Sequence, residues 1–192
     1  MDTALLDRRL AALFPAPPPS PGGEASSPSV YAVLDGARDD RIYKAVYESR
    51  LEYECLFAGE LPYQLTLAAP YLVRLDAAAP FTRWLLEEGF GRSFGVFAWS
   101  GADIEALRRH FRRLLQVKDE DGKKLYFRFY DPRVLRVYLP TCSSSELKEV
   151  FGPVGRFVVE GAEGQALAYE RGGRPLRVIE SLPGPRALTD PS

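Results

Sequence analysis

The stretch "YFRFYDPRVLRVYLP" at residues 126–140 shows the sharpest change of pattern in the sequence. Up to Tyr130 the residues are mostly aromatic and typical of a strand, and from Pro132 onward apolar residues recur at helical spacing. Asp131 stands between the two patterns, where an aspartate can cap a helix and a proline suits the first helical turn. Arginines flank this carboxylate on both sides, so an anion site and a catalytic carboxylate are alternative interpretations.

We predict that this stretch is a strand-to-helix joint in which Asp131 acts first as a helix cap. A helix over 132–139 has an apolar stripe of Val134, Leu135, Tyr138 and Leu139, with Arg133 and Arg136 turned outward. Arg128 lies on the otherwise apolar strand, and a cation there needs a carboxylate partner. Asp35, which ends the first strand of the body, is our candidate for that partner.

The totals describe an ordinary globular chain of 192 residues, with 46% hydrophobic and 27% charged residues. The formal net charge of −1 provides no basic field that would attract nucleic acid or acidic lipid. Cys55 and Cys142 form neither a disulfide framework nor a metal-binding spacing, and two reduced thiols are expected. The sequence shows no signal-peptide pattern and no apolar window long enough to span a membrane, so we expect a cytoplasmic protein.

Changes in composition divide the chain into five parts. Residues 1–14 contain a short amphipathic helix, and residues 15–29 are a linker rich in Pro, Ser and Gly. The helix either docks on the body or serves as a detachable arm. The main α/β lobe is expected at 30–130, a small C-terminal lobe at 131–181 and a flexible tail at 182–192.

Apolar runs and helical periodicities alternate through the body, which predicts an α/β fold with a mainly parallel or mixed sheet flanked by helices. Strands are expected at 30–36, 53–57, 71–75, 94–99 and 124–129. Helices are expected at 39–49, 80–88, 132–139 and 144–151, and in a segment that begins with a capping box from Ser100 to Asp103 and buries Ile104, Leu107, Phe111 and Leu114. Short antiparallel strands at 154–160, 165–171 and 175–180 complete the C-terminal lobe.

The motifs that would carry chemistry have ordinary structural explanations. His110, the single histidine of the chain, adjoins the apolar stripe of an arginine-rich helix, so we predict a structural, partly exposed side chain. "CSSS" at 142–145 is typical of a helix start with a capping hydroxyl. "DEDG" at 119–122 lacks the ligand spacing of a calcium loop. "GFGRSFG" at 89–95 leads from a helix into a strand, the wrong order for a phosphate cradle. We expect no catalytic, metal or cofactor site.

Aromatic residues are abundant, with ten Tyr, eleven Phe and two Trp, and aromatic and arginine side chains are enriched in protein interfaces. Candidate partner-binding residues are Tyr63, Tyr71 and Tyr138, expected near the surface, and Arg108, Arg109 and Arg112. These arginines, together with Arg113, are also the best candidates for nucleic-acid contacts. We favour a solvated helix face as their explanation, because cations complement the dipole at the end of a helix and Glu105 can pair with Arg108 or Arg109.

Six motifs occur in an order that resembles the bacterial domain-of-unknown-function family 4123. They are "YAVLDGARD" (31–39), "YECLFAG" (53–59), "APYLVRL" (69–75), "FGVFAWSGADIEALRRHFRRLLQV" (94–117), "FRFYDPRVLRVYLP" (127–140) and "FGPVGRFVVE" (151–160). The resemblance covers about residues 30–160, and the helix that precedes "RFYDPRVL" makes that block its most specific part. The matching signature residues are Asp35, Arg128, Tyr130, Asp131, Pro132 and Arg133.

The resemblance implies a Tap-type adaptor, or chaperone, that holds an effector of the type VI secretion system and helps load it onto the VgrG spike. The expected partners are therefore an effector toxin and VgrG, without nucleic acid or membrane. Two hypotheses from other classes stay open. One is a phosphoester hydrolase that uses Asp131, Arg128, Arg133 and His110, and the other is a nucleic-acid-binding domain that uses the arginine helix.

Overall fold

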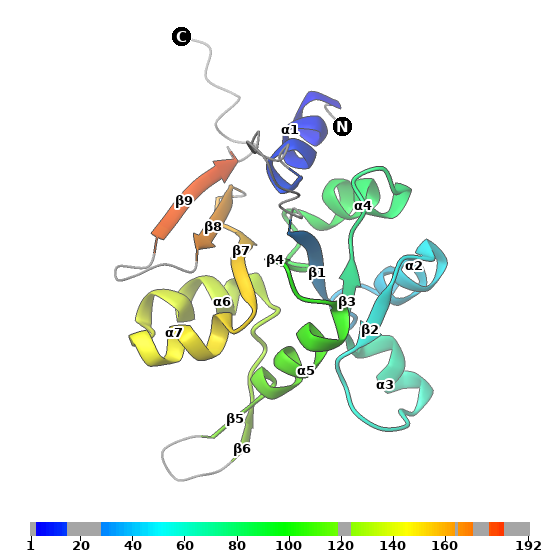
Figure 1. Ribbon diagram of the computed structural model, residues 1–192. Coiled ribbons are helices and arrows are strands. Elements are labelled where there is room, and N and C mark those ends of the chain that lie inside the picture. The colour runs from blue at the N-terminus through cyan, green and yellow to red at the C-terminus, as the bar shows by residue number, and fades with distance from the viewer. Residues whose placement is uncertain (1–2, 15–27, 119–123, 164, 171–176, 183–192) are drawn as a thin grey trace, which may run out of the picture.

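The computed structural model describes residues 3–14, 28–118, 124–163, 165–170 and 177–182, and its core is a seven-stranded sheet with the order β2-β3-β1-β4-β7-β8-β9 (Figure 1). The strands of this sheet are β1 (Ser29–Asp35), β2 (Tyr53–Cys55), β3 (Pro70–Arg74), β4 (Gly95–Ser100), β7 (Val154–Glu160), β8 (Ala166–Glu170) and β9 (Arg177–Leu182). A separate two-stranded hairpin consists of β5 (Gln116–Lys118) and β6 (Lys124–Tyr126).

Helices cover both faces of the sheet. They are α1 (Thr3–Leu13), α2 (Arg41–Ser49), α3 (Tyr63–Ala68), α4 (Pro80–Trp84), α5 (Ile104–Leu114), α6 (Pro132–Tyr138) and α7 (Ser144–Phe151). A π-helical turn, η1 (Leu85–Gly89), continues α4, and a 3-10 turn, η2 (Leu139–Thr141), continues α6. None of the helices in the described ranges is long and apolar enough to cross a membrane.

The side chains of the central strand β1 alternate between two hydrophobic cores. Tyr31 and Val33 belong to the core that also contains α5, α6 and α7 residues. Val30, Ala32 and Leu34 belong to the core on the opposite face, with residues of α1, α2 and α4. Because both faces are covered, β1 reads as one continuous apolar run in the sequence.

The α/β class with flanking helices is confirmed, but the strand directions differ from the mainly parallel or mixed sheet that alternation favoured. Every described pairing in the sheet is antiparallel. Continuous apolar runs are typical of parallel strands, yet here they come from helices on both faces of an antiparallel sheet. The short strands expected near the C-terminal end are antiparallel, and they extend this sheet because β7 pairs with β4.

The N-terminal helix α1 was expected either to dock on the body or to form a detachable arm, and the structure shows it docked. Leu6 and Leu13 of α1 are 3% and 2% exposed, and both lie in the core beside α2 and α4. Most of the proposed linker, residues 15–27, lies outside the described residues. So do the "DEDG" turn at 119–122 and residues 183–192 of the expected tail.

Two local predictions need correction. Helix α5 is capped by Asp103, whose side chain accepts a hydrogen bond from the backbone N–H of Ala106, and not by Ser100. The Ser100 hydroxyl donates to the Pro153 carbonyl and accepts from the Ala102 N–H, so it joins the start of β7 to the loop before α5. Helix α3 was not expected, because it buries no residue and so leaves no apolar stripe in the sequence.

Gly95 provides a test of the sheet packing. A Cβ atom at this position would lie 2.1 Å from the Val33 carbonyl oxygen of the neighbouring strand, so the two strands would have to separate. We expect Gly95→Ala to lower the free energy of unfolding by about 1–3 kcal/mol, measured by denaturant titration. Gly155→Ala is the matched control, since a Cβ there lies 3.7 Å from its nearest neighbour. Equal effects of the two substitutions would contradict the described β1–β4 register.

Candidate partner-binding surface

The joint at residues 126–140 has the predicted capping geometry, but the strand before it, β6, ends at Tyr126, so Arg128 follows the strand and does not lie on it as expected. The Asp131 carboxylate accepts hydrogen bonds from the backbone N–H of Arg133 at 3.0 Å and from its guanidinium at 2.9 Å and 2.6 Å. Burial alone would raise the pKa of Asp131, but the hydrogen bonds from Arg133 outweigh it and hold the pKa below its usual value. Asp131 is therefore the N-cap of α6, and Pro132 occupies the first turn as expected.

Arg128 binds the carboxylate that the sequence suggested. Its Nη2 donates to Oδ2 of Asp35, which is 2% exposed at the end of β1. The other carboxylate oxygen of Asp35 accepts from the Ala37 N–H at 3.2 Å. Burial lowers the pKa of the Arg128 guanidinium, but the charge and hydrogen bond of Asp35, together with Tyr130 and Asp131, outweigh burial, so the net shift is upward. This ion pair fastens the segment after β6 to the central sheet.

Phe57 and Tyr126, together with the Arg128 side chain of this ion pair, make up what we call the aromatic surface. The rings of Phe57 and Tyr126 meet edge to face with centroids 5.9 Å apart. The Arg128 guanidinium lies 5.7 Å from the ring centroid of the buried Tyr130. Burial, followed by the interaction with the Tyr130 hydroxyl, raises the pKa of Tyr126, so the Tyr126 hydroxyl is neutral at physiological pH.

The aromatic surface remains accessible to solvent, although Arg128 is bound to the buried Asp35. Tyr126 is 48% exposed and the Arg128 side chain 45% exposed. The large hydrophobic side chains that are exposed in the described part of the chain are Tyr47, Tyr63, Leu65, Leu125, Tyr126 and Val137. Four of these six lie on the β5–β6 hairpin or on α3, which Figure 1 shows at the same end of the molecule with α5 between them.

Helix α5 positions the Phe57 side of the aromatic surface through two of its arginines. Arg112 donates from Nη2 to the carbonyl oxygens of Cys55 and Phe57, at 3.1 Å and 2.6 Å. Arg108 pairs with Glu54 on the same edge strand at 3.4 Å. These two arginines thus hold β2 and the segment after it, and only part of the predicted basic cluster faces outward.

The remaining predicted partner-binding residues differ in position. Tyr63 is 73% exposed on α3, as expected. Arg109 is exposed and pairs with Glu105 at 3.3 Å. Tyr138 is half-buried, with its ring edge to face on Phe127.

Tyr71 does not lie near the surface, contrary to the expectation. It is 2% exposed, and its hydroxyl donates to the Thr66 carbonyl at 2.6 Å. The sequence missed this because Tyr71 sits on a strand whose two faces are both covered. Neither Phe57 nor Tyr126 was among the candidates. Phe57 follows β2 and Tyr126 lies on the hairpin, so their contact joins segments that are far apart in the sequence.

His110 is buried, not partly exposed as predicted. It is 3% exposed, and Nε2 is hydrogen-bonded to the Val150 carbonyl on α7 at 2.9 Å. Burial lowers the pKa of His110 and favours the neutral ring. Asp131 meanwhile binds Arg133, and the described contacts of His110 do not include Asp131. The convergence that the hydrolase hypothesis requires is therefore not seen among the described residues.

No cluster of metal-binding side chains is apparent in the described ranges. They contain no group of three or more His, Cys, Asp or Glu side chains able to hold a metal ion. Cys55 and Cys142 are free thiols, and burial raises the pKa of each, which disfavours the reactive thiolate. The exposed side chains that stand out in the described ranges are thus aromatic and cationic ones.

Comparison with known proteins agrees with the resemblance seen in the sequence. The model of the family described as "Domain of unknown function (DUF4123)" matches residues 30–149. The chain is also 30% identical over 114 residues to the accessory protein VasW of Vibrio cholerae serotype O1. That alignment covers 58% of this chain and 38% of VasW, so the chain spans less than half the length of its relative. No solved structure matches the chain.

The capping role of Asp131 predicts a loss of stability when its side chain is removed. Asp131→Ala should lower the free energy of unfolding by about 1 kcal/mol at neutral pH. Asp131→Asn is the matched control, because asparagine keeps a capping oxygen while losing the charge, and it should cost less. The folded pKa of Asp131 is depressed, so the Ala deficit should be complete above the unfolded pKa of about 3.9 and should shrink as pH falls through the lower folded pKa. A deficit that grows on acidification would contradict this assignment.

Proposed function

The chain belongs to the DUF4123 family, and from that premise we propose that it is a non-catalytic adaptor of type VI secretion. It binds an effector toxin in the bacterial cytoplasm and helps load this effector onto the VgrG spike. The accessory role in the name of VasW supports an assisting function rather than a toxic one. The observation that carries the proposal at the level of the structure is the accessible aromatic surface of Phe57, Tyr126 and Arg128.

The composition of this surface supports protein binding. Tyr and Arg are the residue types most enriched at interface hot spots, and hot-spot side chains are strongest when their positions are fixed before binding. Tyr126 packs against Phe57, and Arg128 is held by Asp35. The exposed Tyr63 and Leu65 on α3 lie at the same end of the molecule and can enlarge the contact toward about 800 Å² per partner.

The local chemistry supports a role without catalysis. The carboxylate of Asp131 is occupied by the helix it caps, and His110 is buried against α7. A general acid or base has to lie within hydrogen-bond reach of the group whose proton it transfers, and the hydrogen bonds described for these two side chains go to Val150 and Arg133 instead. Arg108 and Arg112 bind parts of the same chain, which weakens the nucleic-acid alternative.

Co-expression with the neighbouring effector and spike genes tests the proposal. The tagged wild-type chain should co-purify with at least one of these proteins. Tyr126→Ala should weaken the capture at least tenfold, because a hot-spot truncation costs about 2 kcal/mol of binding energy or more. Tyr47→Ala, which removes a 64% exposed tyrosine on α2, is the matched control and should leave the capture unchanged.

Two results would count against the proposal in different ways. If the wild-type chain captures neither protein and its deletion leaves effector delivery intact, the adaptor function is wrong. If capture occurs but is equally strong with Tyr126→Ala, the adaptor function stands and the aromatic surface is not its binding site.

A further inference from the structure

The docking of α1 combines apolar contacts with a buried cation. Leu6, Arg9 and Leu13 are the buried residues of this helix, and they recur at the spacing of one helical face. Arg9 is only 6% exposed. Arginine is rarely buried to this degree without dedicated partners, because its desolvation is costly. The surface that contacts α1 must therefore provide partners for a guanidinium group.

Three groups of the body supply this receptor for Arg9. Nη1 of Arg9 donates to the Leu86 carbonyl oxygen at 2.7 Å, in a turn of η1 where carbonyl groups run out of helical partners. The guanidinium carbon lies 4.4 Å from the centroid of the Phe90 ring, within the range of a cation–π contact. Burial lowers the pKa of Arg9, and the negative charge of Glu160 opposes that shift.

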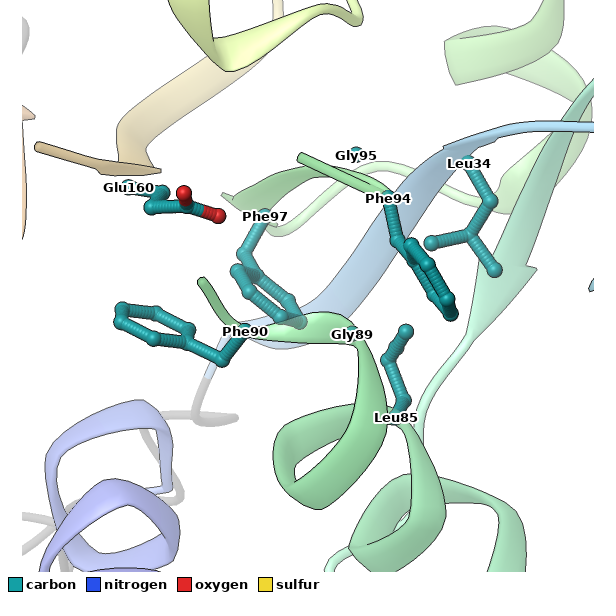
Figure 2. A pocket seen from close by; sticks show the side chains of 8 residues that line it. All are labelled: Leu34, Leu85, Gly89, Phe90, Phe94, Gly95, Phe97 and Glu160. Atoms are coloured by element: carbon teal, nitrogen blue, oxygen red, sulfur yellow. The ribbon is translucent and has the colours of Figure 1, made fainter. Parts of the chain in front are cut away.

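Glu160 also shapes the loop beside this receptor. Its Oε2 accepts hydrogen bonds from the backbone N–H groups of Gly91 and Ser93, at 2.9 Å and 3.0 Å. Figure 2 shows Glu160 and Phe90 at the edge of a pocket whose wall includes Phe94 and Phe97. The receptor is thus organised by the body itself, through contacts that do not involve α1.

The helix that fills this receptor has the properties of an exchangeable ligand. With 11 residues, α1 is shorter than the roughly 12–15 residues that an isolated helix needs to be stable in water, so its helicity depends on docking. It precedes the family domain, which begins at residue 30, whereas Leu86 and Phe90 lie within that domain. The intervening residues 15–29 include six prolines and two glycines, a composition suited to a tether.

We propose that the face covered by α1 is a binding site for an amphipathic helix of a partner protein. This partner helix carries two leucines seven residues apart and an arginine three residues after the first leucine. Helix α1 occupies this site within the chain and is exchanged for the partner helix. The charge requirement comes from the Leu86 carbonyl and Glu160, which together favour a cation at the centre of the contact. The proposal rests on the α1 contacts alone and holds whether or not the chain serves type VI secretion.

Exchange of a labelled peptide tests this site without any effector or spike protein. A protease site is introduced among residues 20–26 of the full chain, and the purified protein is cleaved there. A fluorescent peptide of residues 2–14 is then titrated and its anisotropy measured. The cleaved protein should bind the peptide saturably. The uncleaved chain should bind at least tenfold more weakly, because tethering gives α1 an effective concentration near the millimolar range.

Two further peptides test whether binding depends on the pattern of Leu6, Arg9 and Leu13 rather than on the other residues of α1. A peptide with Arg9→Glu should bind at least tenfold more weakly than the native one, since it places a carboxylate against Glu160 and the Leu86 carbonyl. A peptide that keeps only Leu6, Arg9 and Leu13 in an Ala/Glu/Lys background should bind within about threefold of the native peptide. Retained binding would show that a foreign helix with this pattern is accepted.

Other results would overturn the proposal. If the cleaved protein keeps its thermal transition but binds no peptide, α1 is a fixed part of the fold. If the uncleaved chain forms concentration-dependent dimers that Arg9→Glu abolishes, the occupant is α1 of a second copy rather than a partner protein. Should cleavage cause aggregation, the full-length Arg9→Glu variant opens the site instead, and a folded variant that fails to bind the native peptide overturns the proposal equally.

Discussion

The Asp35 carboxylate is buried at the end of the central strand, and a buried charge has to be paired. Arg128 provides the pairing from a segment 93 residues away in the chain. The contact fixes where the chain lies after it leaves the β5–β6 hairpin, and therefore where the aromatic side chains around Arg128 are presented. Asp131, three residues later, then starts α6 by capping it. The Asp35–Arg128 ion pair and the Asp131 cap thus fix the position of the segment between β6 and α6 relative to the sheet.

The sheet provides the rigid support for this arrangement. Because β1 is covered on both faces, its two sets of side chains tie the helices of the two layers to one another. Helix α5 then reaches across the sheet edge, where Arg112 binds the carbonyl groups on either side of Leu56. The hairpin and the β2 edge consequently meet at the contact between Tyr126 and Phe57. Side chains that are fixed in this way lose less conformational entropy if they enter an interface.

Helix caps and the pairing of a buried charge could be predicted from the sequence, whereas strand directions and the burial of particular side chains largely could not. The Asp131 cap, the Ser143 cap of α7 and the pairing of Asp35 with Arg128 follow from rules that act over a few residues or from the cost of burying a charge. The strand directions could not be predicted from the sequence, because an apolar run has the same composition whether the neighbouring strands are parallel or antiparallel. Tyr71 could not be recognised as buried, because its sequence neighbours do not reveal that both faces of its strand are covered. The burial of Arg9 was equally hidden, since the periodicity of α1 marks its apolar face but not the acceptors that meet a cation there.

The central claim is that Asp35 and Arg128 stabilise the fold as a pair, so that each depends on the other. A double-mutant cycle with Asp35→Asn, Arg128→Gln and the double variant measures this coupling in the free energy of unfolding. Because the Arg128 side chain is partly exposed, the account predicts a coupling energy of about 1 kcal/mol, with the double variant less destabilised than the sum of the single ones. Strictly additive effects would mean that the two residues act independently, and would contradict the account.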